Sequence, residues 1–247
     1  MQEPVPCNLR ALAQPVDTLY PAIMRTESVK HLMRKGKRPL DPGGVLLDDV
    51  VSRGRVDLAV VFGNARPVEV EIGVGKGAFL LSRAPARPEI NLLGIEYTKS
   101  YAVYSADRVR RADLANVRIA HCDAVHFVTV CLDDGSLRRV HIYFPDPWPK
   151  RRHHRRRLIQ PRFIGQIQRV LQPGGQLIIV TDHQDYFRQI QQVVTNASGF
   201  ASIRFPRAAS ANAEIAGTNY ERKYAAQGRP FYCIARMRYD RTTGKLF

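Results

Sequence analysis

The chain has 247 residues, of which 45% are hydrophobic and 24% are charged, a composition typical of a globular protein. Its 38 lysines and arginines outnumber its 22 acidic residues, and the resulting net charge of +16 favours partners rich in negative charge. No close cysteine pair, zinc-finger histidine spacing, secretory signal or membrane-length apolar run is present. These absences argue against a metal module, a disulfide framework and a membrane span, and they fit a cytoplasmic protein.

Residues 1–60 are expected to form a basic, partly ordered N-terminal extension. This region is rich in proline and glycine, weakly periodic, and carries a basic zone at 30–38. Such a composition favours short helices at most. Residues 61–247 are expected to form the single folded domain.

From residue 67, short apolar runs alternate with segments of helical period, which is typical of a doubly wound, mainly parallel α/β sheet. The expected strands are Val68–Ile72, Asn91–Glu96, Val117–His121, Val140–Phe144 and Gln176–Thr181, with one more within 231–239. Helices are expected at 158–171 and 183–197, where apolar residues recur on one side. The Gln172–Gly175 segment is expected to end the first of these helices.

Acidic residues follow every expected parallel strand. In open α/β sheets, ligands bind at the carboxyl ends of the strands. The residues expected at that edge are Glu71, Gly73, Gly75, Gly77, Glu96, Asp123, Asp146 and Asp182. An acid after a strand is also a common helix N-cap, a role that Asp123 and Asp182 both fit. Five acids at one edge of such a basic chain nevertheless favour a binding site.

The glycine spacing alone does not identify the cofactor, because Gly73-x-Gly75-x-x-Ala78 also fits a dinucleotide fingerprint. An NAD(P)-dependent oxidoreductase is therefore an alternative. Glu96 stands where doubly wound folds place an acid that accepts hydrogen bonds from ribose hydroxyls. Acids on both sides of the glycines suit a nucleoside with a positive centre, and S-adenosylmethionine carries a sulfonium and an ammonium but no phosphate. We therefore expect S-adenosylmethionine as the cofactor.

The densest positive charge lies at residues 150–157, which read Lys-Arg-Arg-His-His-Arg-Arg-Arg. Like charges repel and no acid within the run offsets them, so a nucleic-acid surface is favoured over an ordinary solvated face. Phosphate contacts are expected from Arg152, His153, His154, Arg155, Arg156 and Arg157. Trp148, just before the run, has two open roles: stacking on a base or filling the core.

Four motifs follow one another along residues 67–239. They are Glu71-Ile-Gly-x-Gly-x-Gly77, Phe144-Pro-Asp-Pro-Trp-Pro-Lys150 with its basic tail, Thr181-Asp182, and Thr218-Asn-Tyr-Glu221. In this order they resemble the tRNA (guanine-N7-)-methyltransferase family. The resemblance implies a seven-stranded Rossmann-like methyltransferase fold. It also implies methyl transfer from S-adenosylmethionine to N7 of a tRNA guanine, at position 46 in the variable region.

The resemblance also implies roles for individual residues. Glu71, Glu96, Asp123 and Asp146 would line the cofactor site, and Asp146 would be catalytic. Substrate contacts would come from Lys150, Asp182, Thr218, Asn219, Tyr220 and Glu221. The partner implied is tRNA, with no metal and no membrane, and either a monomer or a homodimer fits.

The chemistry sets further expectations. Guanine N7 carries a free lone pair and needs no general base, so we expect Asp146 to stabilise the charge that develops on the purine. Asp182 or Glu221 is expected to accept the guanine N1–H and N2 amine. Thr218-x-x-Glu221 also fits a helix capping box. A methyltransferase acting on another RNA base or on an amino group is a further alternative.

Overall fold

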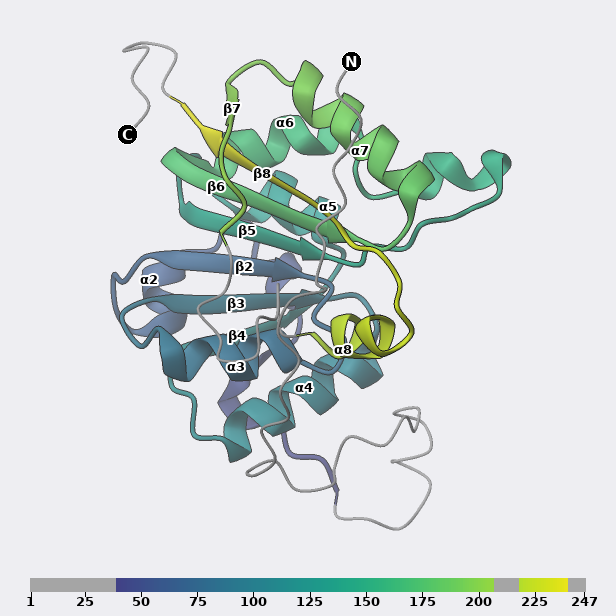
Figure 1. Ribbon diagram of the computed structural model, residues 1–247. Coiled ribbons are helices and arrows are strands. Elements are labelled where there is room, and N and C mark those ends of the chain that lie inside the picture. Colours follow the sequence, from purple (N-terminus) through teal and green to yellow (C-terminus); the bar gives the residue numbers. More distant parts are fainter. Residues whose placement is uncertain (1–38, 207–217, 240–247) are drawn as a thin grey trace.

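The structure, a computed structural model, describes residues 39–206 and 218–239 (Figure 1). The basic zone expected at 30–38 lies outside the described residues. None of the helices in the described ranges has the length and hydropathy of a membrane-crossing segment.

The described strands form one twisted sheet in the order β1-β4-β3-β2-β5-β6-β8-β7 (Figure 1). Their bounds are β1 Leu46–Leu47, β2 Val68–Ile72, β3 Asn91–Glu96, β4 Val117–His121, β5 Leu137–Tyr143, β6 Leu171–Thr181, β7 Phe200–Ser202 and β8 Tyr232–Arg238. Neighbours from β1 to β6 pair in parallel, whereas β8 pairs antiparallel with both β6 and β7. The expected mainly parallel sheet is confirmed. It gains an eighth strand, the two-residue β1, at its edge.

The helices connect the strands in doubly wound fashion. They are α2 Leu58–Phe62, α3 Ala78–Ala86, α4 Lys99–Arg111, α5 Ala124–His126, α6 Pro161–Val170, α7 Gln184–Asn196 and α8 Asn219–Ala226, with 3-10 helices η1 Gly43–Val45, η2 Val50–Arg53 and η4 Arg151–Arg156 and the π-helix η3 Phe127–Cys131. Helix α6 starts at Pro161 and not at 158, because proline is pre-organised for the first helical position. The expected turn Gln172–Gly175 lies instead within β6, as an irregularity in its pairing with β5.

The two faces of the sheet are covered by different helices. Val70 and Ile72 of β2 pack on the face that carries α2, η3, α6 and α7. Leu92 of β3 and Ile178 of β6 pack on the face that carries α3, α4 and α8. Successive side chains of a strand point to opposite faces. Glu71 and Glu96 therefore belong to the α3–α4 face.

Residues 45–60 contribute to this body. Val45, Val50 and Val56 are buried, and Leu46 and Leu47 pair with β4. The domain boundary expected at residue 60 falls inside α2. A two-residue strand has no periodicity that a sequence pattern can reveal.

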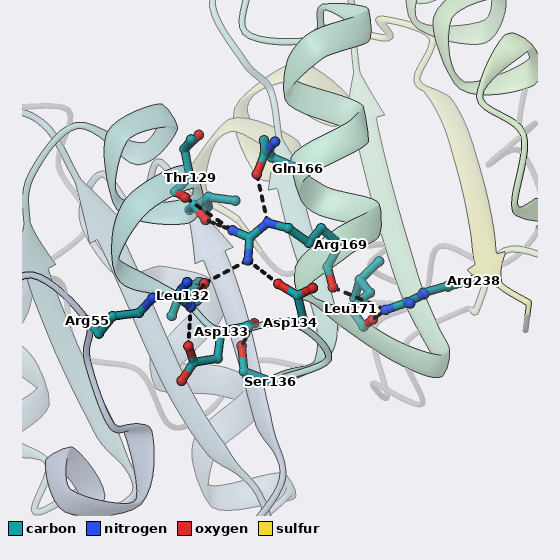
Figure 2. Close-up of polar contacts among 11 residues, drawn as sticks. Arg55, Thr129, Leu132, Asp133, Asp134, Ser136, Gln166, Arg169, Leu171 and Arg238 are labelled. Carbon is teal, nitrogen blue, oxygen red and sulfur yellow. Dashed lines mark hydrogen bonds and ion pairs between the residues drawn. The ribbon is translucent and has the colours of Figure 1, made fainter.

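Arg169 at the end of α6 contacts η3, the loop that follows η3 and Arg238 at the end of β8 (Figure 2). It precedes the first residue of β6 and so lies at the end of the sheet opposite the carboxyl edge. Its guanidinium donates to the carbonyl oxygens of Val128 and Leu132, at 2.7 and 2.9 Å, and pairs with Asp134 at 2.6 Å. Arg238 in turn donates to the Arg169 carbonyl at 3.1 Å. The π-helix η3 ends here, and Arg169 supplies donors to carbonyls that lie in and just after its last turn.

Candidate active site

The site begins where the order of the strands reverses. The chain runs from β2 outward to β3 and β4, then returns to β5 and β6 on the other side of β2. Since β2 to β6 are parallel, their carboxyl ends share one edge. The crevice between β2 and β5 is the topological switch point at which such folds bind ligands.

A glycine loop covers this point directly after β2. Gly73, Gly75 and Gly77 have φ angles of +83°, +51° and +71°, a region that side chains with a Cβ rarely adopt. A Cβ placed on Gly73 or Gly75 would meet no atom within 4 Å. One placed on Gly77 would lie 3.0 Å from the Cβ of Ser105. The first two glycines therefore expose backbone to open space, where a ligand can approach closely.

Two carboxylates lie beneath this loop. Glu71 is 3% exposed, and its Oε2 has no hydrogen-bond partner. Glu96 accepts hydrogen bonds from the backbone N–H groups of Gly75 and Thr98, at 2.9 and 2.8 Å. Burial, and then the charge of Glu96, raises the pKa of Glu71 well above its usual range. A buried carboxylate oxygen without a hydrogen-bond partner, near a second carboxylate, favours the binding of a cationic ligand and disfavours that of a diphosphate.

Glu71 should release its proton when a cation binds. Its raised pKa means that the carboxyl of the free protein stays protonated to a higher pH than an ordinary glutamate does, and a nearby ammonium or sulfonium would lower that pKa. The affinity for S-adenosylmethionine should therefore rise with pH. Calorimetry over a series of pH values, in two buffers of different ionisation enthalpy, should report net release of protons when the cofactor binds. A Glu71→Gln variant should release none, and equal release from both proteins would contradict this role.

Exposed apolar side chains closely follow two of the acids in the chain. Tyr97, directly after Glu96, is 75% exposed, and Val125, two residues after Asp123, is 43% exposed. Exposed apolar side chains beside an acid suit a purine ring. Asp123 itself accepts a hydrogen bond from the His126 N–H at 2.8 Å. Asp123 is thus a helix cap as well as a residue of the edge. The sequence analysis did not single out Tyr97 or Val125 as binding residues.

The turn that carries Asp146 follows β5. Phe144 and Trp148, at its two ends, have φ angles of +50° and +40°. Positive φ in bulky residues is strained and is concentrated at functional sites. The Phe144 N–H donates to the Val180 carbonyl at 2.7 Å, and its ring meets Phe231 edge-on. The turn therefore holds Asp146 exposed at the carboxyl edge.

The basic run forms the short helix η4, for which the exposed Lys150 is the N-cap. Arg152, Arg155 and Arg156 are exposed, as expected of a phosphate-binding surface. The Arg156 guanidinium lies 5.0 Å from the Trp148 ring centre.

The two histidines of η4 are half-buried. The His153 ring meets Trp148 edge-on at 5.8 Å, and the Nε2 of His154 lies 3.9 Å from Asp185. Trp148 is thus half-buried in contact with an arginine and a histidine. It is not a core residue, and its ring is not fully exposed. These side chains leave the exposed arginines as the main candidates for phosphate contacts.

The expectation that Arg157 contacts phosphate from an exposed surface is wrong. Arg157 is 2% exposed, and its guanidinium is engaged within the protein. It is therefore not part of the exposed surface that the sequence suggested. Nothing in the letters of the run distinguishes it from the exposed arginines beside it.

Apart from Lys150, the expected substrate residues lie on or near α8, whose Tyr224 packs against Phe144 of the turn that carries Asp146. Asp182 pairs with Arg229 at 3.2 Å, and the rings of Phe144 and Tyr224 lie 5.9 Å apart. His183, and not Asp182, caps α7, since its Nδ1 accepts from the Tyr186 N–H.

Thr218 caps α8 through its hydroxyl, which accepts from the N–H of the buried Glu221 at 3.0 Å. This is one half of the expected capping box. Asn219 and Tyr220 begin the helix, but their side chains lie outside the described part. The capping role of Thr218 fixes where Glu221 stands relative to the carboxyl edge.

A hollow of about 670 Å³ lies between α6, α7 and η4 and is lined by residues such as Gln168, Gln192 and Asn196. None of its lining residues is an expected cofactor residue. The candidate site at the carboxyl edge is a different place.

Comparisons with known proteins bear on the identity of this site. A family model described as a putative methyltransferase matches residues 65–234. A tRNA (guanine-N(7)-)-methyltransferase of Nitrosococcus oceani is 42% identical over 150 residues, which are 61% of this chain and 64% of that protein, just under two thirds. One of Listeria monocytogenes is 37% identical over 70% of this chain and 80% of its own length. The chain belongs to the tRNA (guanine-N(7)-)-methyltransferase family.

This membership confirms the resemblance that the motifs indicate. The fold agrees with it. A solved 30S ribosomal A1408 methyltransferase from an uncultured bacterium is similar with a TM-score of 0.53, at 15% identity, over 74% of this chain and 95% of that one. The alternative of an NAD(P)-dependent oxidoreductase is set aside.

This family member also carries a buried polar cluster behind Glu71, on the same face of the sheet, that the sequence analysis did not find. Glu69 of β2 accepts from the guanidinium of Arg83 at 2.7 Å and from the Nε2 of His141 at 2.9 Å. The Nδ1 of His141 lies 2.7 Å from the Tyr143 hydroxyl. A neutral His141 that donates to the Oε2 of Glu69 and accepts from Tyr143 gives each of the three groups a hydrogen-bond partner. The signal was present in the sequence, as polar residues at alternate positions of two buried strands.

The cluster should make stability depend on pH. Burial lowers the pKa of His141 to about 4, and repulsion from Arg83 and Arg139 acts in the same direction. The attraction to Glu69 raises this pKa but does not offset the burial. The unfolded chain therefore binds one more proton than the folded one between about pH 6.5 and 4, and stability falls as pH falls through that window. The unfolding free energy should drop by on the order of 1–2 kcal/mol more in wild type than in His141→Gln between pH 7 and 5. Urea titrations at both pH values test this, and an identical drop in the two proteins would contradict it.

Proposed function

We propose that this chain transfers the methyl group of S-adenosylmethionine to N7 of a guanine in tRNA, at position 46 of the variable region. The observation that carries the proposal is that a buried carboxylate pair, Glu71 and Glu96, and the turn that leads into the exposed basic helix η4 lie at the carboxyl ends of parallel strands, at one edge of the sheet. A cationic nucleoside fits the first, and a phosphate backbone fits the second. The turn of Asp146 joins them along the chain.

The cofactor, when bound, supplies an electrophilic methyl on a sulfonium, and the bond from carbon to sulfur breaks as the bond to N7 forms. Glu71 would face a positive group through its orphaned oxygen, and Glu96 would accept from ribose hydroxyls while holding Gly75. Tyr97 and Val125 would cover the purine. Gly73 and Gly75 would admit the ligand to the backbone.

Asp146 would lie beside the guanine that receives the methyl. Positive charge moves from sulfur onto the purine in this reaction, and a fixed carboxylate stabilises that change. No proton leaves N7, so Asp146 acts by position and charge. The guanine N1–H and N2 amine would be accepted by Asp182, which Arg229 orients, or by Glu221 at the start of α8.

Helix η4 would hold the tRNA by its phosphates. Arg152, Arg155 and Arg156 present exposed guanidinium groups, and phosphate contacts position a substrate without reading its sequence. Such a surface suits a folded RNA of fixed shape. It has no evident use for a methyl acceptor of a few atoms.

The proposal is tested by incubating the protein with an unmodified tRNA transcript and S-adenosylmethionine labelled in its methyl group. Reduction and aniline cleavage, which cut RNA at N7-methylguanine, then locate the label. We expect one cut, at guanine 46. Label that resists aniline, or that appears on another base or on protein, would support a different methyltransferase activity and overturn the proposal.

A further inference from the structure

Arg157 is the one arginine of the basic run that is buried. Its Nε donates to the Pro147 carbonyl at 2.8 Å, its Nη1 to Gln189 at 2.7 Å, and its Nη2 to Asp185 at 2.6 Å. Its guanidinium also lies 4.8 Å from the centre of the Tyr186 ring. A planar guanidinium with five donors can make all these contacts at once, and a lysine cannot. Helix α7 supplies three of the four partners.

The fourth partner, Pro147, lies in the turn of Asp146. Its carbonyl stands one residue after Asp146 and one before Trp148, which has a strained φ. Residues in such conformations persist only where the surrounding structure over-determines them. The prolines on either side of Asp146 restrict the turn internally. Arg157 ties it to a rigid helix from outside.

The same hydrogen bond closes a loop. The chain leaves the turn at Trp148, passes through η4 and returns to the turn at Arg157. Inside this loop, Arg156 and His153 both contact the Trp148 ring. The loop that carries the exposed basic residues is therefore closed by the contact between Arg157 and Pro147, directly beside Asp146.

We propose that Arg157 is a positioning residue for methyl transfer, which clamps the turn of Asp146 to α7 and so fixes Asp146 relative to RNA held on η4. The proposal rests on the proposed function, since it assigns Asp146 and η4 their roles. It separates Arg157 from its neighbours: they bind phosphate, whereas Arg157 sets geometry. Misplacement of a catalytic group by 1 Å can cost about 100-fold in rate.

The test compares Arg157→Lys and Arg157→Met with wild type. Turnover at saturating tRNA and cofactor should fall by about 30- to 100-fold in both variants. The dissociation constants for tRNA and S-adenosylmethionine should stay within about threefold, and the salt dependence of tRNA binding should keep its slope. Loss of a direct phosphate contact would instead weaken tRNA binding and reduce that slope by about one. That pattern would overturn the proposal.

Trp148 provides a readout that needs no activity. It is the only tryptophan in the chain, so its fluorescence reports on this turn alone. In folded Arg157→Met protein, quenching of Trp148 by acrylamide should increase. Asp185→Asn weakens the ion pair with Arg157 at a half-exposed position. It should increase quenching and lower turnover as Arg157→Met does, but by a smaller amount. This variant replaces Arg157→Met in the test if Arg157→Met does not fold. Unchanged quenching in both variants would overturn the proposal.

Arg188→Met is the matched control. Arg188 is an exposed arginine on α7, one residue before Gln189, so its replacement removes the same charge from the same helix. It should alter neither quenching nor turnover, and an equal effect would show that charge alone matters. Failure of the proposed function would look different: wild type would not methylate tRNA, while the quenching difference between wild type and Arg157→Met would remain.

Discussion

Asp146→Asn should lower the rate of tRNA methylation by roughly 100- to 1,000-fold, because a preorganised charge aimed at the reacting group is worth about 2.7–4 kcal/mol in such sites. The side chain keeps its size, and the two prolines and the clamp of Arg157 keep its place. Affinity for S-adenosylmethionine should change by less than about threefold if the carboxylate acts mainly in the transition state. Single-turnover methylation with enzyme in excess measures the effect.

Asp113→Asn is the control for that experiment. Asp113 is exposed after α4 and has a φ of +53°, a conformation that asparagine also tolerates. The substitution removes the same charge without touching the site, and its rate should equal that of wild type. Wild-type turnover in Asp146→Asn, with cofactor binding unchanged, would remove Asp146 from the chemistry.

Arg169→Met should lower the free energy of unfolding by roughly 2–4 kcal/mol. The replacement removes the donors that Arg169 supplies to the carbonyls of Val128 and Leu132 where η3 ends, and Leu132 keeps only the longer contact from Arg55 at 3.5 Å (Figure 2). The exposed ion pair with Asp134 adds little to this figure, because solvent screens it. Guanidinium titration at pH 7 measures the loss.

Arg162→Met, an exposed arginine of the same helix, is the comparison. It should change stability by less than about 0.5 kcal/mol. Methylation by folded Arg169→Met protein should remain, since the cluster lies away from the carboxyl edge. An effect of Arg169→Met no larger than that of Arg162→Met would show that η3 does not depend on this arginine.

Three of the strands around the site could be predicted to the residue. Val68–Ile72, Asn91–Glu96 and Val117–His121 have the expected bounds, because buried parallel strands are short apolar runs bounded by polar or glycine residues. Other bounds moved. Strand β5 starts at Leu137 and not at Val140, β6 includes the Gln172–Gly175 segment as an irregularity, and α6 starts only at Pro161. Strand order alone brings the acids that follow β2 to β6 to one edge.

The roles of charged residues were harder to predict, because burial depends on the path of the backbone. Arg157 reads like its neighbours, yet it turns inward to Asp185 and the Pro147 carbonyl. Glu69 was passed over within an apolar strand, although Arg83 and His141 enclose it. Asp182 was expected as a possible cap, but a neighbouring side chain took that role. Most of these pairings join residues far apart in sequence, so a local pattern can reveal polar residues within a buried strand but not their partners.

The most direct measurement compares two tRNA transcripts that differ in one atom: one with guanosine at position 46 and one with 7-deazaguanosine, in which a C–H group replaces N7. Both should bind with equal affinity, because the phosphates that meet η4 are unchanged. Labelled S-adenosylmethionine should transfer its methyl group stoichiometrically to the first transcript and not at all to the second. Equal labelling of the two would mean that the methyl group goes elsewhere, and the assignment of this carboxyl edge to guanine N7 would fail.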